Sequence, residues 1–177
     1  MRKRKRLWHV PPAQVGNGAW FFLTVCCATR GRAQLDKREI FNVMSAAVEY
    51  YVAAGKWRVG IFLAMPDHWH ALAEFPDPSD MANVVRNWKR FVAKRTGVVW
   101  QDGFFDRRLR TLSDILEKWE YIRSNPVKAG LVPSPEAWRY SWMGDENVLS
   151  AWGRAGCPWA AGFGSGALGI TRHHPAD

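Results

Sequence analysis

Short apolar runs along the chain predict strands. Residues 19–28 are aromatic and β-branched, which is typical of a buried strand. Residues 57–65 and 68–75 are two further apolar runs, joined by Pro66-Asp67, and this turn chemistry favours a β-hairpin. Residues 104–109 are consistent with one more short strand.

Longer segments with a helical repeat separate these strands. Residues 37–54 carry apolar side chains at helical spacing, and Ser79 opens a second such segment. A capping-box pattern at 111–114 predicts a third helix that runs to about Ser124, with Pro126 just past its end. The order strand, helix, strand, strand, helix, strand, helix predicts an α+β sandwich, in which an antiparallel sheet has its helices packed on one face.

The length of 177 residues suits one domain with a tail. We assign residues 1–150 to this domain, including a basic arm at 1–18 in which Arg2, Lys3 and Arg4 are candidate phosphate contacts. Residues 151–177 are rich in glycine and poor in charge, which predicts a flexible tail.

The charge balance points to a polyanionic partner. Twenty-five Lys and Arg against 16 Asp and Glu leave a net charge of +9, which favours nucleic acid or an anionic membrane surface. The sequence has no apolar run of the roughly 18 to 20 residues that a membrane helix needs. Its three cysteines form no CxxC pair, and prolines and glycines interrupt any signal-peptide pattern, so we expect a cytoplasmic protein.

The first candidate site is His68-Trp69-His70. On a strand the side-chain period is two, so both imidazoles project from one face and Trp69 from the other. Two such imidazoles can chelate one divalent cation, although a pair of hydrogen-bonded histidines would give the same pattern. The expected place at the sheet centre favours the metal, because two buried polar rings need partners.

The second candidate is Tyr121, which lies off the apolar stripe of the third predicted helix. A tyrosine on a polar helix face is often only an amphipathic surface residue. Asn125 follows one helical turn later, however, so a phenol and an amide oxygen could meet at one point.

Three blocks in register resemble the REP-associated tyrosine transposases, which are single-tyrosine HUH nucleases. The blocks are Met65-Pro-Asp-His-Trp-His-Ala71, Trp100-Gln-Asp-Gly-Phe-Phe-Asp106 with Arg110, and Tyr121-Ile-Arg-Ser-Asn-Pro-Val-Lys-Ala-Gly-Leu-Val132. The resemblance runs from about Trp20 to Trp142 and implies a ferredoxin-like fold. It also implies a Mg²⁺- or Mn²⁺-dependent enzyme that cuts and rejoins single-stranded DNA beside hairpins of repetitive extragenic palindromes (REP or BIME-like elements).

The resemblance assigns roles to individual residues. His68 and His70 match the metal ligands, Tyr121 the nucleophile and Asn125 the third ligand, where related insertion-sequence transposases often have Gln. Attack by the phenol would leave a phosphotyrosine at the DNA 5′ end, and that ester would allow rejoining without ATP. Asp67 stands where the family commonly has Asn, and Arg107 where His is frequent, which bears on substrate preference more than on chemistry.

Further cations are candidate DNA contacts, although a solvated cationic face is the ordinary alternative. They lie on the second helix and around the fourth strand: Arg86, Lys89, Arg90, Lys94, Arg107, Arg108 and Arg110. We expect a monomer or homodimer at the nucleoid, without membrane contact. A hairpin-DNA or structured-RNA binder without catalysis is the main alternative, and a membrane-surface protein would explain the charge but not the motifs.

Overall fold

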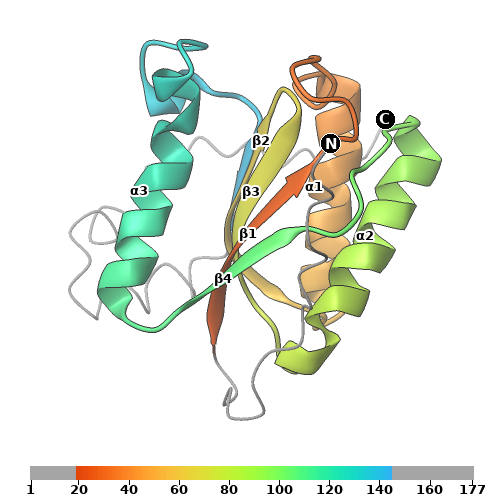
Figure 1. Cartoon of the computed structure of the whole chain (residues 1–177), viewed down its shortest axis with the longest axis vertical. Coiled ribbons are helices and arrows are strands. Elements are labelled where there is room, and N and C mark those ends of the chain that lie inside the picture. The colour runs from red at the N-terminus through yellow and green to blue at the C-terminus, as the bar shows by residue number, and fades with distance from the viewer. Residues whose placement is uncertain (1–18, 145–177) are drawn as a thin grey trace, which may run out of the picture. The chain divides into compact units, whose positions relative to one another are not determined.

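The computed structural model describes residues 19–144, which build a five-stranded antiparallel sheet with three helices (Figure 1). The strands are β1 (Trp20–Cys26), β2 (Arg58–Met65), β3 (His68–Glu74), β4 (Phe105–Leu109) and β5 (Ser141–Met143), in the spatial order β4-β1-β3-β2-β5. The helices are α1 (Arg38–Ala53), α2 (Met81–Thr96) and α3 (Leu112–Lys128), with 3-10 turns η1 (Pro78–Asp80) and η2 (Pro135–Ala137). The predicted basic arm and the predicted tail lie outside the described residues.

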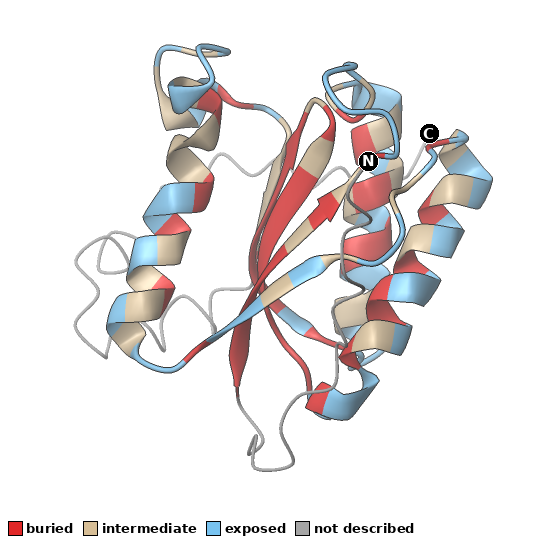
Figure 2. Cartoon of the chain, viewed as in Figure 1, coloured by how far each residue is buried: buried red, intermediate tan, exposed pale blue. Residues whose placement is uncertain are grey.

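The α+β architecture predicted from the sequence is confirmed, and β3, which carries both histidines, is the middle strand. One face of the sheet packs against α1 and α2 through a core that includes Trp69 and Trp88, both fully buried. Their rings lie 5.1 Å apart. Figure 2 shows the red buried stripes of α1 and α2 turned toward the sheet.

The prediction that the helices share one face holds for α1 and α2 but not for α3. Figure 1 shows α3 on the opposite side of the sheet. Strand β2 is buried along almost its whole length, so the sheet presents apolar side chains on both faces and needs a cover on each. The buried residues Ile115, Trp119 and Ile122 of α3 supply the second cover.

The predicted start of α3 is correct, but its predicted end is wrong. Thr111 and Asp114 form the capping box, with hydrogen bonds of 3.1 and 3.0 Å between side chain and backbone. The helix then continues through Pro126 to Lys128. A proline has a helical φ and removes only one backbone donor, and the next turn still closes through the Ala129 amide, which donates to the Asn125 carbonyl at 2.9 Å.

Strand β5 was not predicted. Its three residues are too few to show a period of two, and its position comes from pairing with Ile61–Leu63 of β2. In residues 19–144, no helix has both the length and the apolar composition needed to cross a membrane.

Candidate active site

The two histidines of β3 project from the sheet face that α3 covers. Trp69 points the other way into the core, where its ring lies 5.0 Å from that of Phe62. The rings of His68 and His70 lie 4.8 Å apart, centroid to centroid. The predicted common face of the two imidazoles is therefore confirmed.

Asp67 fixes the orientation of His68. Its Oδ1 lies 2.7 Å from His68 Nδ1, while its Oδ2 accepts a hydrogen bond from the Gly31 amide at 2.7 Å and pairs with Arg30 at 3.2 Å. Burial acts to raise the pKa of the Asp67 carboxyl, but the bonds from Gly31 and His68 and the charge of Arg30 outweigh it and lower that pKa. Because Nδ1 is engaged, Nε2 of His68 is the ring nitrogen left for a metal ion.

His70 is held in a similar way. Its Nδ1 lies 2.8 Å from the Thr24 hydroxyl on β1, and its ring stacks on Phe22 at 5.3 Å. Burial lowers the pKa of the His70 imidazole to about 3, and the neighbouring His68 adds to this effect. His70 therefore stays neutral at physiological pH, which is the protonation state that a metal ligand requires.

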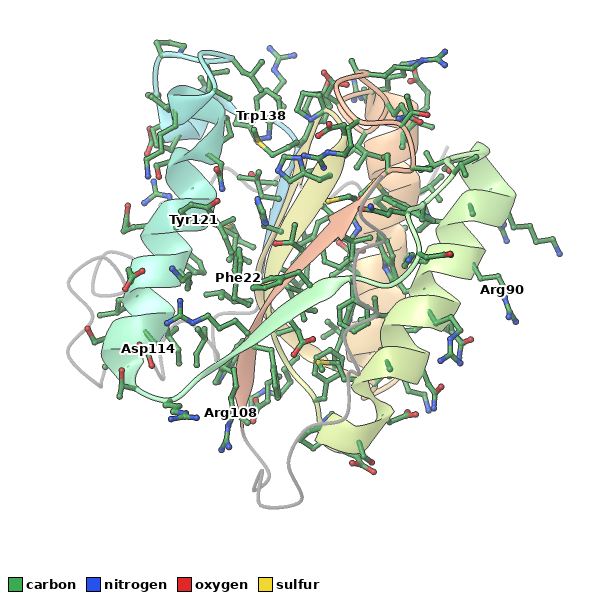
Figure 3. All side chains as sticks on the ribbon, in the orientation of Figure 1. Phe22, Arg90, Arg108, Asp114, Tyr121 and Trp138 are labelled. Atoms are coloured by element: carbon green, nitrogen blue, oxygen red, sulfur yellow. The ribbon has the colours of Figure 1, made fainter. Side chains whose placement is uncertain are left out.

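Helix α3 brings Tyr121 to these rings. The Tyr121 ring lies 5.8 Å from His70 and 5.7 Å from Phe22, both in edge-on contacts, and 39% of the residue stays exposed. Figure 3 shows Tyr121 and Phe22 in the space between α3 and the sheet. His70 and Tyr121, 51 positions apart in the sequence, therefore meet at one site. They meet because α3 packs on the sheet face that carries the histidines.

Two lysines flank the tyrosine. Lys118 Nζ lies 5.4 Å and Lys128 Nζ 5.5 Å from the centre of the Tyr121 ring. Lys118 is three residues before Tyr121 and Lys128 seven after it, so a helical repeat could have identified both. Lys118 lies within the helix predicted from the sequence, whereas Lys128 lies beyond the predicted end near Ser124.

The donors present fit a divalent cation. Asn125 lies one turn after Tyr121, and its amide oxygen is of a type that binds Mg²⁺ and Mn²⁺. Its buried Nδ2, which has no hydrogen-bond partner among the described residues, is a donor and not a metal ligand. Residues 19–144 contain no cluster of three His, Cys, Asp or Glu suited to a metal ion. His68, His70 and Asn125 stay a predicted ligand set.

The predicted DNA contacts fall into two groups. Arg107 and Arg108 on β4 and Arg110 before α3 are exposed, and Arg107 lies opposite Phe22 in the β1–β4 register, on the face of the histidines. The second group is on α2, which covers the opposite face of the sheet (Figure 1). Its exposed members are Arg86, Arg90 and Lys94. Figure 3 shows Arg90 pointing away from the sheet.

Lys89 differs from these α2 neighbours. Its Nζ donates to the carbonyls of Gln101 and Gly103, each at 2.8 Å, and burial lowers the pKa of its ammonium group. Lys89 therefore stabilises the loop that leads into β4. The remaining predicted contacts, Arg2, Lys3 and Arg4, lie outside the described residues.

A solved structure shares the fold of this chain. That structure is of a REP-associated tyrosine transposase bound to a REP hairpin, with a TM-score of 0.65 over 79% of this chain and 82% of that one. The identity is 22%, so this likeness establishes the fold.

Sequence comparison finds relatives of the same kind. The REP-associated tyrosine transposase of Escherichia coli K12 is 26% identical over 154 residues, which is 77% of this chain and 92% of that protein. A protein of Haemophilus influenzae, provisionally named a REP-associated tyrosine transposase, is 24% identical over 70% of this chain and 79% of its own length. No protein-family model matches the chain. The relatives confirm the resemblance that the three sequence blocks predicted.

Proposed function

We propose that this protein is a metal-dependent endonuclease and strand transferase for single-stranded DNA, which acts beside hairpins through a 5′-phosphotyrosine intermediate. The observation that carries the proposal is the packing of Tyr121 against His70, on the sheet face that His68 shares. The relatives named REP-associated tyrosine transposases and the solved neighbour bound to a REP hairpin support it.

In this mechanism the Tyr121 oxygen attacks the scissile phosphorus. The phenol proton passes to water, which reaches the half-exposed residue, and the bond to the 3′ oxygen breaks. The leaving 3′ oxygen takes a proton from water. The products are a phosphotyrosine at the 5′ end of the downstream fragment and a free 3′-hydroxyl on the upstream fragment. Attack of a 3′-hydroxyl on the phosphotyrosine reverses the step and releases Tyr121.

The residues around Tyr121 would orient the scissile phosphate and neutralise its negative charge. His68, His70 and Asn125 would hold Mg²⁺ or Mn²⁺, which supplies charge neutralisation and in-line positioning of the phosphate. Lys118 and Lys128, on either side of the phenol, would add positive charge where the pentavalent phosphorus gathers negative charge. Asp67 and Thr24 keep the two imidazoles in place.

The proposal predicts selective cleavage of single strands. An oligonucleotide from the palindromes flanking the protein's own gene, carrying a hairpin and single-stranded flanks, should be cut with Mn²⁺ and left intact with a chelator. The perfect duplex of the same sequence should stay intact, since Tyr121 sits between a helix and the sheet, with little room for a continuous duplex. Equal cutting of both forms would contradict the proposal, and binding without cutting would favour the non-catalytic hairpin binder.

A further inference from the structure

One aromatic side chain beside the candidate site is left uncovered. Phe105 is 47% exposed on β4, the outer strand of the sheet on that side. The pale segments of β4 in Figure 2 mark this exposed strand. An outer strand is usually protected by charged or polar side chains. A single exposed phenylalanine is ordinary by itself, so the position of Phe105 relative to the site decides whether it has a role.

The sheet register places Phe105 on the side of the histidines. Phe105 lies opposite Thr24 on β1, and Thr24 lies opposite His70 on β3, so the three residues form one row across the sheet. Residues directly opposite one another point to the same face. Phe105 therefore stands two strands, or about 10 Å, from His70.

The rings form a continuous aromatic path to the nucleophile. Phe105 lies 6.4 Å from Phe22 at 69° between ring planes, and Phe22 in turn contacts both His70 and Tyr121. Phe22 is buried, so Phe105 is the end of the path that meets solvent. A flat group that stacks on Phe105 would be separated from the reacting tyrosine by one ring, that of Phe22.

One exposed cation, Arg107, lies next to this aromatic edge. Arg107 follows Phe105 by two residues, which puts its side chain on the same face, and it is exposed. Hydrogen bonds are the larger cause of the lowered pKa of two carboxyls in the first turns of α3, Asp114 and Glu117, and the charge of Arg107 contributes to each. An aromatic face beside cations is the combination that binds an unpaired nucleotide, base on ring and phosphate on cation.

We propose that Phe105 is a stacking platform for one unpaired base that flanks the scissile phosphate, and that Arg107 holds a phosphate of the same strand. This inference rests on the proposed function and deepens it, because it identifies what the site recognises. Stacking tolerates any base, since every base has a π-face, but it requires a base free of its duplex partner. Phe105 would thus favour single strands independently of the chemistry at Tyr121.

The test measures binding rather than cleavage, in a Tyr121→Phe background. The probe is a hairpin oligonucleotide from the flanking palindromes, with 2-aminopurine placed in turn at each unpaired position beside the stem. Protein should quench the fluorescence at one position, and Phe105→Ala should restore it and weaken binding about 5- to 150-fold. Phe105→Trp should retain both signals, whereas Phe105→Leu, which keeps bulk without a π-face, should lose the quenching.

Phe91 supplies the matched control. It is 39% exposed on α2, where Arg95 lies 5.0 Å from its ring, away from the sheet face of Tyr121. Phe91→Ala should leave the quenching unchanged. An abasic nucleotide at the quenched position should make the affinities of the Tyr121→Phe parent and its Phe105→Ala variant equal. If Phe105→Ala binds and quenches like its parent, the inference is overturned. That result is distinct from failure of the proposed function, which would appear as wild-type protein that binds the hairpin without cutting it.

Discussion

Asp67 shows how much one residue outside the motif histidines contributes to the site. It bonds His68 Nδ1, the Gly31 amide and Arg30 at once, so it links the β2–β3 hairpin to the loop after β1. A carboxylate behind an imidazole fixes the tautomer and raises the basicity of the other ring nitrogen. Asp67 is therefore placed to act as a positioning residue for His68.

Substitutions at Asp67 should change the Mn²⁺ requirement of cleavage. Asp67→Ala should raise the Mn²⁺ concentration for half-maximal cutting by about 10- to 100-fold, because His68 loses its partner. Asp67→Asn keeps a hydrogen bond without the charge and should fall between Asp67→Ala and wild type. Arg30→Ala, which removes an ion pair and leaves the contact to His68, is the control and should have the smallest effect. An Asp67→Ala variant with an unchanged Mn²⁺ requirement would rule out this role.

At the scale of elements, the position of α3 decides whether a site exists. The histidine face, the capping box and the tyrosine helix were all predictable, because each depends on a local period or pattern. The side of the sheet on which α3 packs was not, because no local pattern encodes it. Lys128 could not be placed on the helix, because a proline at position 126 predicts that the helix ends before it. The exposure of Phe105 could not be predicted either, because it depends on β4 being an edge strand, which no local pattern encodes.

Helix α2 offers a second test at this scale, because its cations lie far from Tyr121 in the fold. If Arg90 and Lys94 contact the hairpin backbone, replacing both with Ala should lower affinity and reduce the salt slope by about two. The measurement is hairpin affinity between roughly 50 and 200 mM salt. Glu39→Ala and Glu49→Ala, on the neighbouring helix α1, provide an exposed control that removes the opposite charge. An unchanged slope in the Arg90 and Lys94 double variant would show that this face is only solvated.

At the scale of the whole molecule, the sheet separates two layers with different properties. The α1 and α2 side holds the larger core, rich in tryptophan, whereas the α3 side holds the polar rings, the tyrosine and the flanking lysines. The composition predicted a polyanionic partner but could not divide the cations between these layers. The three-block resemblance predicted the fold and pointed to His70 and Tyr121 together, which are 51 positions apart in the sequence and in contact in the structure.

The central claim is that the Tyr121 oxygen becomes joined to DNA. Wild-type protein incubated with Mn²⁺ and a labelled single-stranded hairpin substrate should acquire a covalent DNA adduct that survives denaturation, and Tyr121→Phe should acquire none. Tyr50→Phe, which alters a 70% exposed tyrosine on α1, should form the adduct like wild type. Peptide mapping of the adduct should place the nucleotide on Tyr121. Label retained on the Tyr121→Phe protein, or mapped to another tyrosine such as Tyr140, would falsify the assignment.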